Sequence, residues 1–171
     1  MPYVEDLINI ENARILWPNF SGKKSQYNRE GDRNFNVIIP DADMANKLKD
    51  DGWNIHVREP REEGDQPEYR LPVAVSFDYK PPKITLITSR KQTLLDETTV
   101  GLLDHADIKT IDMTIRPYNW KRTVKDRDGT EYEETGVKAY LKTMYVVLEE
   151  DAFAHKYAEE EYPGEPPFDA D

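Results

Sequence analysis

The sequence contains no cysteine, which excludes disulfide bonds and thiolate metal sites and fits a reducing compartment. No segment approaches the ~20 consecutive apolar residues that a membrane-spanning helix needs. The N-terminus has no basic stretch followed by an apolar one, so we expect neither a secretion signal nor a membrane partner. Phosphate-binding glycine loops, dinucleotide fingerprints and nucleophile elbows are also missing. These absences leave few signals for an enzyme.

Charge is distributed unevenly along the 171 residues, of which 37% are apolar and 33% charged. The net charge is −11, but residues 149–171 hold nine acids against one lysine, a net of −8. Residues 1–148 hold 25 acids and 22 bases, a net of −3, and residues 14–39 carry five bases against two acids. Such a body can bind a polyanion through local fields. We predict a domain at residues 1–150 and an acidic tail at residues 151–171.

Short alternating segments indicate a mainly β fold, because the chain has no long helices with which to cross between parallel strands. An antiparallel small barrel or sandwich is the natural class. Asp41 or Asp43 can cap a short helix that ends at Gly52. Residues 93–107 are ambiguous between a helical turn and a loop. We expect strands at residues 8–17 (with a bulge near Glu11–Asn12), 35–39, 53–59, 70–79, 83–89, 108–120 and 137–150, and a hairpin loop with an Asp128–Gly129 turn at residues 121–136.

The stretch "TIRPYNWKR" (114–122) places aromatic and basic side chains at alternate positions. Ile111, Met113 and Ile115 have the parity of the core. The opposite parity carries Arg116, Tyr118, Trp120 and Arg122, and the returning strand adds Lys138, Tyr140 and Lys142. Bases stack on aromatic rings whatever their sequence, and cations between the rings neutralise phosphates. The face therefore suggests a nucleic-acid surface, and the alternative is that the rings pack under a loop with the cations lying over them.

The polar segment after the first strand holds a second group of aromatic and basic residues. Long polar loops often carry function, and this one could close over a nucleic-acid backbone; an ordinary solvated loop is the alternative. Its candidate binding residues are Trp17, Lys23, Lys24, Tyr27, Arg29 and Arg33. Weaker groups, which we interpret as solvated surface, are Tyr79, Lys80 and Lys83, and Arg90 with Lys91.

A metal site and a partner-binding tail are the other candidates. Asp104, Asp107 and Asp112 could hold a divalent metal with His105, although carboxylates in a loop are far more often solvated. We expect no metal and no cofactor. The tail is charged and Pro-rich, and it could dock on a partner, cover the protein's own basic face, or serve only solubility. Its candidate partner-binding residues are Glu159, Glu160, Glu161, Tyr162 and Phe168.

The segments "INIENARILWPNFSG", "RNFNVIIPD", "DGWNIHV", "KITLITSRKQTLLDE", "IDMTIRPYNW" and "GVKAYLKTMYVVLEED" together resemble bacteriophage single-stranded DNA-binding proteins, across most of residues 7–168. The resemblance implies an OB-fold-like small barrel with one or two short helices and a disordered acidic tail. It also implies a protein, not an enzyme, that coats and protects single-stranded DNA in the host cytoplasm during replication and recombination. In such proteins the tail recruits replication enzymes and often ends in an aromatic, whereas here Asp169–Asp171 follow Phe168.

The rival hypothesis is a protein-interaction or structural phage module, of adaptor or DNA-mimic type, that binds no nucleic acid. In that case the aromatic residues of the 111–147 hairpin would be buried against another chain. A homo-oligomer fits both hypotheses, and the sequence leaves the oligomeric state open.

Overall fold

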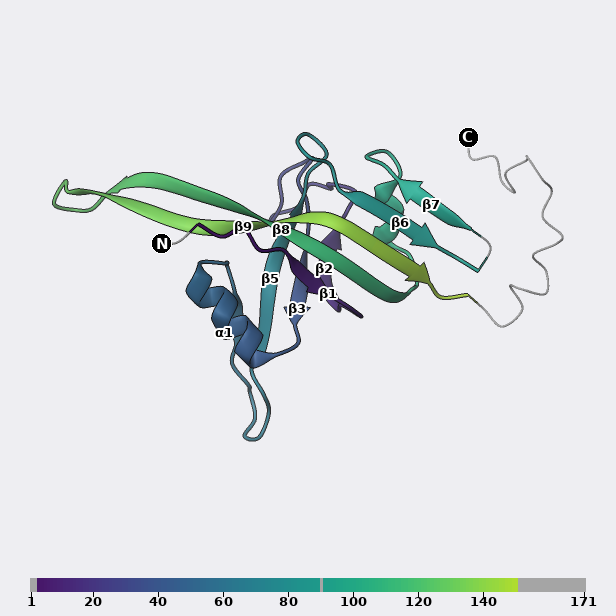
Figure 1. Cartoon of the computed structure of the whole chain (residues 1–171), viewed down its shortest axis with the longest axis horizontal. Coiled ribbons are helices and arrows are strands. Elements are labelled where there is room, and N and C mark those ends of the chain that lie inside the picture. The colour runs from purple at the N-terminus through teal and green to yellow at the C-terminus, as the bar shows by residue number, and fades with distance from the viewer. Residues whose placement is uncertain (1–2, 90, 151–171) are drawn as a thin grey trace.

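The computed structural model describes residues 3–89 and 91–150, and strands dominate this part of the chain (Figure 1). The elements are β1 (Ile8–Ile10), β2 (Ile15–Asn19), β3 (Arg33–Ile39), α1 (Ala42–Asp51), β4 (His56–Arg58), β5 (Glu68–Val75), β6 (Lys83–Ile87), β7 (Gln92–Leu95), the 3₁₀ helix η1 (Val100–Asp104), β8 (Ile108–Lys125) and β9 (Glu131–Leu148). The mainly β class predicted from the sequence is confirmed. The predicted acidic tail, residues 151–171, lies outside the described residues.

The described strands form one mixed sheet with the path β1–β8–β9–β5–β3–β2. β4 joins at β5, and β6 pairs with both β7 and β9. Most pairs are antiparallel, but β9 runs parallel to β5 and to β6, so the expectation of antiparallel pairing alone was wrong there. A parallel pair needs a long crossover, and here strands and a 3₁₀ helix supply it in place of a long α-helix. The arrangement is consistent with an OB-like fold.

The β8–β9 hairpin is the longest feature of the fold, with 18 residues in each strand. Near the body, Ile111, Met113 and Ile115 pair with buried residues of β9, with a bulge between Thr114 and Ile115. Farther out, the hairpin extends from the body as a two-stranded ribbon (Figure 1). The predicted loop at residues 121–136 is therefore wrong, since only residues 126–130 turn. A ribbon exposed on both faces needs no apolar alternation, so the sequence gives no strand signal there.

The N-terminal part of the chain forms two strands where the sequence predicted one bulged strand. β1 pairs with β8, whereas β2 pairs with β3. Asn12 lies between them with a φ of 51°, and its N–H donates to Asp112 Oδ1 at 2.9 Å. This break allows the chain to leave one strand and join another.

Helix α1 has the ends that the sequence predicts. The Asp41 carboxylate accepts from the Asp43 N–H at 3.0 Å, and Gly52 has a φ of 106°, a conformation that suits glycine at a C-terminus. Ala45 and Leu48 are buried against the core. Trp53 is buried as well and lies outside any strand, so the strand predicted at 53–59 shortens to β4.

The hydrophobic core lies on the inner face of the sheet. Its largest fully buried side chains come from both halves of the chain and are Phe20, Phe35, Leu71, Ile84, Ile115, Leu141 and Met144. Each such side chain contributes about 1.5–3 kcal/mol by leaving water, so the core fixes which face of β8 and β9 remains outside. No helix in the described part of the chain is long and apolar enough to cross a bilayer.

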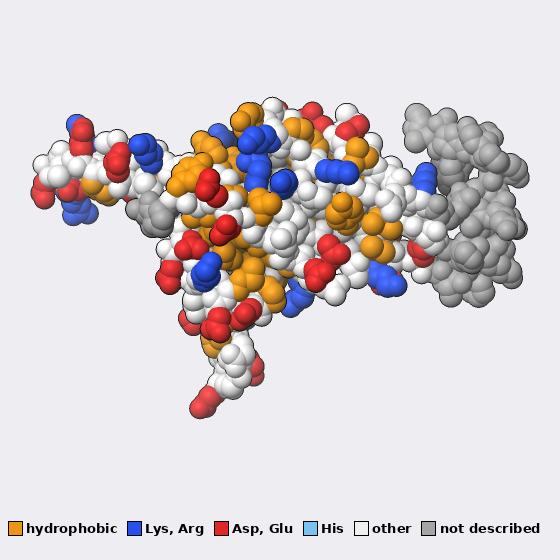
Figure 2. Space-filling view, in the orientation of Figure 1, with side chains coloured by type: hydrophobic (Ala, Val, Ile, Leu, Met, Phe, Trp, Pro, Cys, Tyr) orange, Lys and Arg blue, Asp and Glu red, His pale blue; other side chains and the backbone are white. Residues whose placement is uncertain are grey.

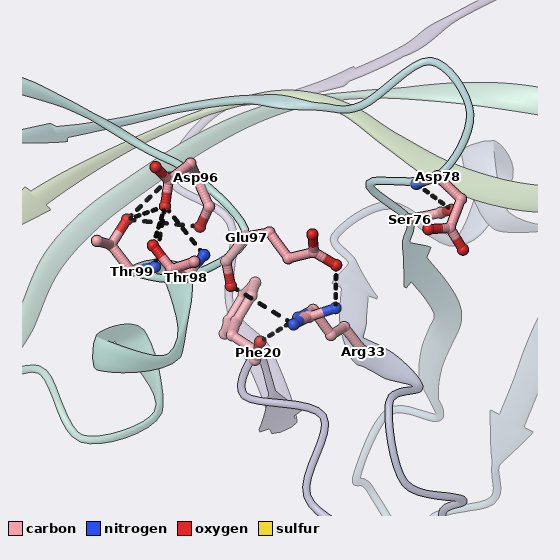
Figure 3. A network of polar contacts seen from close by, with 8 residues as sticks. All are labelled: Phe20, Arg33, Ser76, Asp78, Asp96, Glu97, Thr98 and Thr99. Carbon is pink, nitrogen blue, oxygen red and sulfur yellow. Dashed lines mark hydrogen bonds and ion pairs between the residues drawn. The ribbon is translucent and has the colours of Figure 1, made fainter.

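The ambiguous segment at residues 93–107 forms the end of β7, a turn and η1. Asp96 accepts hydrogen bonds from the side-chain and main-chain donors of Thr98 and Thr99. The Thr98 hydroxyl, followed by that of Thr99, lowers the pKa of the Asp96 carboxyl below its ordinary value. This ordered turn positions Glu97 opposite Arg33 (Figure 3).

Candidate functional site

The outer face of the β8–β9 hairpin carries the aromatic and basic residues that the alternation predicted. In the register, Arg116 lies opposite Tyr140, Tyr118 opposite Lys138, and Trp120 opposite Gly136. Because these pairs share the face that the core leaves free, their side chains are neighbours. We call Tyr118, Trp120 and Tyr140, with Arg116 and Lys138, the aromatic strip.

Tyr140 is the centre of the aromatic strip. The ring of Tyr118 meets it edge-on at a centroid distance of 5.9 Å. The guanidinium carbon of Arg116 lies 4.7 Å from the Tyr140 ring centroid, and Lys138 Nζ lies 5.0 Å from it. Tyr118 is still 52% exposed. The strip therefore combines fixed rings with cations, which suits a flat and negatively charged ligand.

Trp120 packs against Gly136 on the opposite strand. A Cβ atom added to Gly136 would come within 2.5 Å of the indole ring, so only glycine leaves room for the ring in this position. The sequence predicted that Gly136 lies in the hairpin loop at residues 121–136, but it is part of β9 and shapes the site. An aromatic residue packed on a cross-strand glycine is a recognised way to stabilise a sheet. The indole is half-buried as a result.

Arg122, the outermost predicted member of this face, is partly neutralised. Its Nη2 lies 2.7 Å from Glu134 Oε1, and its Nε donates to the same oxygen at 2.8 Å. Its guanidinium carbon also lies 5.6 Å from the Trp120 centroid. Arg122 therefore supports Trp120 more directly than it offers charge to a ligand.

A groove of about 970 Å³ joins the aromatic strip to the loop between β2 and β3. Trp120, Lys138 and Tyr140 line one wall, and Arg29 and Arg33 line another. Residues 72–78, from the end of β5 onward, also line it. We call this hollow the first groove. It brings together parts of the two groups that the sequence analysis singled out separately.

Arg33 is held by the protein itself. Its Nε donates to Phe20 O at 3.0 Å, and its Nη1 lies 3.5 Å from a Glu97 carboxylate oxygen (Figure 3). The guanidinium also lies 5.5 Å from the ring centroid of Phe77, and the side chain is only 17% exposed. These contacts assign Arg33 a mainly structural role at the edge of the first groove.

The remaining residues of the β2–β3 loop face solvent from an ordered turn. Gly31 N–H donates to Gly22 O at 2.8 Å and closes the base of the loop, where Gly22 has a φ of 75°. The Asn28 amide nitrogen lies within 3.0 Å of three carbonyl oxygens, those of residues 23, 29 and 32. Lys23, Lys24 and Arg29 are exposed, and Tyr27 is 88% exposed.

Trp17 does not line the first groove but lies close to a basic residue that the sequence analysis missed. It has a φ of 51° and a 62% exposed side chain, and the Arg70 guanidinium lies 5.1 Å from its ring centroid. Arg70 shares the outer face of β5 with Pro72 and Ala74, which line the first groove. The alternation of "RLPVAV" contained this signal, since Leu71 and Val73 point into the core.

Lys142, the last predicted residue of the hairpin, is exposed beside a different hollow. It lines a second groove of about 560 Å³, together with Arg116 of the aromatic strip. Figure 2 shows Lys and Arg side chains gathered near the region where β8 and β9 cross in Figure 1, with hydrophobic side chains around them.

The carboxylates considered for a metal site serve the fold separately. Asp104 accepts from the backbone N–H groups of Phe20 and Ser21, at 2.6 and 3.1 Å. Asp112 accepts from the Asn12 N–H in another part of the sheet. Among the described residues, no three His, Asp or Glu side chains gather in a way that could hold a metal ion. The tail residues Glu159–Glu161, Tyr162 and Phe168 lie outside the described residues.

Comparison with known proteins gives one close assignment and several distant likenesses. A family model described as "Putative phage ssDNA-binding domain" matches residues 2–166. The single-stranded DNA-binding protein of bacteriophage Enc34, solved in complex with single-stranded DNA, is 12% identical with a TM-score of 0.47, covering 86% of this chain and 89% of that one. The single-stranded DNA-binding protein gp2.5 of bacteriophage T7 is 10% identical with a TM-score of 0.41, covering 97% and 100%. No curated protein matches. The family model carries the assignment, since likenesses this distant add no argument.

Proposed function

Because the chain belongs to the phage single-stranded DNA-binding domain family, and is accordingly a binding protein and not an enzyme, we propose that it binds single-stranded DNA through the aromatic strip and the first groove. Binding is independent of sequence, because the rings offer stacking and the cations offer phosphate contacts. The protein coats and protects single strands during phage replication and recombination, in the cytoplasm of the host. The acidic tail recruits partner proteins or regulates binding.

One observation supports this proposal most directly: the strand register puts three aromatic rings and two cations on one outer face. A face that was only part of the core would bury its rings, whereas Tyr118 is half-exposed and Tyr140 and Trp120 line an open groove. Arg29 of the β2–β3 loop lines the same groove, and Lys23, Lys24 and Tyr27 are exposed on the same loop. The proposed binding residues are Tyr118, Trp120, Tyr140, Arg116, Lys138, Lys142, Lys23, Lys24, Tyr27 and Arg29, with Trp17 and Arg122 at the periphery and Arg33 as support.

Titration of labelled oligonucleotides over a range of salt concentrations tests the function. We expect micromolar or tighter binding to single strands, weaker binding to duplex, and a loss of affinity as salt rises. A protein that fails to bind single strands at low salt, even without residues 151–171, contradicts the proposal and favours an interaction module.

Substitution of Trp120 tests the stacking component. Trp120→Ala should weaken binding by about 1–3 kcal/mol, roughly 5- to 150-fold, because the variant lacks the ring on which one base would stack. Tyr132→Ala is the matched control, since Tyr132 is exposed on the hairpin arm but lines neither groove. If Lys142→Ala weakens binding more than Trp120→Ala, charge alone explains the affinity and stacking does not.

A further inference from the structure

The second groove gathers four cations from elements that are far apart in sequence. Lys80 precedes β6, Lys83 begins it, Arg116 lies on β8 and Lys142 on β9. Lys83 is brought into place by parallel pairing, which sets it opposite Thr143, the neighbour of Lys142. The one acidic residue lining the groove is Glu5, so the lining is strongly basic among the described residues.

These four cations are not neutralised by the protein. Within the described part of the chain none of them forms an ion pair, and Lys80 Nζ lies only over the neighbouring Tyr79 ring, at 5.5 Å. Like charges held around one hollow repel each other unless a negative ligand joins them. The arrangement therefore indicates a site for an anion, and not a surface that stabilises the fold.

Two local features support a binding role. The Nε atom of Arg116 is buried and has no hydrogen-bond partner in the part of the chain that the structure describes. Buried donors are nearly always satisfied, so this exception is consistent with an acceptor that comes from a bound ligand. Lys80 has a φ of 49°, a strained conformation for a residue other than glycine, and such strain clusters at functional sites.

We propose that the second groove is a phosphate track, in which Lys80, Lys83 and Lys142 hold the sugar–phosphate backbone of the strand whose bases stack on the aromatic strip. This inference rests on the proposed function. Arg116 joins the two regions, because its guanidinium stacks on Tyr140 and its side chain also lines the second groove. A bound strand thus crosses the β8–β9 hairpin, with bases on the strip and phosphates continuing into the second groove.

The sequence alone favours the opposite view of these lysines. "DYKPPK" contains an isolated basic pair, and isolated basic pairs are usually solvated surface. Lys83 and Lys142 are 59 positions apart, so only the pairing of β6 with β9 brings them to one hollow. The proposal therefore adds Lys80 and Lys83 to the binding surface on structural grounds.

The double variant Lys80→Gln/Lys83→Gln tests the track by the salt dependence of binding to oligothymidylate. For single strands, each lost phosphate contact makes the slope of log K against log salt shallower by about 0.7, so we expect a change of about 1.4. If the contacts contribute nothing at about 1 M salt, affinity at about 0.1 M falls roughly 25-fold. The matched control is Lys47→Gln/Lys49→Gln, which removes the same charge from α1, where neither lysine lines a groove.

The outcomes separate this inference from the proposed function. A loss of slope and affinity in the groove variant but not in the α1 variant supports the track. If both double variants change binding equally, only net charge matters and the track is wrong.

Should the groove variant bind like the unmodified protein while Trp120→Ala weakens binding, the proposed function stands and the track fails. If the unmodified protein does not bind oligothymidylate, the proposed function itself fails. The substituted lysines, which are Lys80 and Lys83 in the groove variant and Lys47 and Lys49 in the control, are all exposed. Both double variants should therefore fold, as a thermal melt can verify.

Discussion

At the scale of single residues, the position of the Trp120 indole depends on the absence of a side chain at Gly136, so we expect DNA binding to depend on it too. Gly136→Ala would put a methyl group where the indole now lies, and the flexible Trp side chain must move. We expect the fold to persist, because alanine is tolerated in a strand, while affinity for single-stranded DNA falls toward that of Trp120→Ala. Titration and a thermal melt of the same variant measure both quantities. Unchanged affinity would mean that the present position of the indole is irrelevant to binding.

For Arg33 we predict a loss of stability without a loss of phosphate contacts, because its contacts lie within the protein. Arg33→Met removes a donor to Phe20 O and the ion pair with Glu97, leaving the carbonyl oxygen without its partner. The free energy of unfolding should fall by about 1–3 kcal/mol. The salt slope of DNA binding should stay the same, since no phosphate contact is lost. Denaturant unfolding and salt titration together check this; a shallower slope with unchanged stability would make Arg33 a DNA contact.

At the scale of elements, the Asn28 side chain makes several of the contacts that order the β2–β3 loop. Asn28→Ala removes the contacts of its amide nitrogen with three carbonyl oxygens and an acceptor for Asn34, but no charge. The loop should become more mobile, so trypsin should cleave at Lys23, Lys24 or Arg29 sooner than in the unmodified protein.

DNA binding by Asn28→Ala should weaken several-fold, because the loop would then lose conformational entropy when it becomes ordered on binding. Asn46→Ala on the exposed face of α1 is the control for a generic asparagine change. Faster proteolysis without any loss of affinity would exclude the loop from the binding surface.

The β8–β9 hairpin and the β2–β3 loop show which features could be predicted from the sequence and which could not. Alternation correctly put Ile115 inside and Tyr118 and Trp120 outside, because the side-chain period of a strand is local and one face meets the core. It missed the strand character of residues 121–125 and 131–136, where neither face of the ribbon packs on a core. It also could not distinguish Arg33, which is held internally, from Arg29, which is exposed, since that depends on Glu97 and Phe20.

At the scale of the whole molecule, the grooves depend on pairings that no local pattern encodes. β9 pairs with β8, β5 and β6, and the two parallel pairings join segments separated by more than fifty residues. These pairings place the first groove beside β5 and the second beside β6. The sequence could therefore predict the residues of the aromatic strip, but not that Lys80 and Lys83 lie near it.

Net charge is also a property of the whole molecule, and from it we predict how the acidic tail affects DNA binding. Residues 151–171 carry seven acids and one lysine, so removing them changes the formal net charge from −11 to −5. Less repulsion of the phosphate backbone should tighten binding to single-stranded DNA, most strongly at low salt, where screening is weak. Titration of the truncated and full-length chains at low and high salt measures the effect. Glu159→Gln/Glu160→Gln/Glu161→Gln keeps the length and removes three charges, so its affinity should lie between the two. A truncated chain that binds no more tightly at low salt would show that the tail does not oppose binding electrostatically.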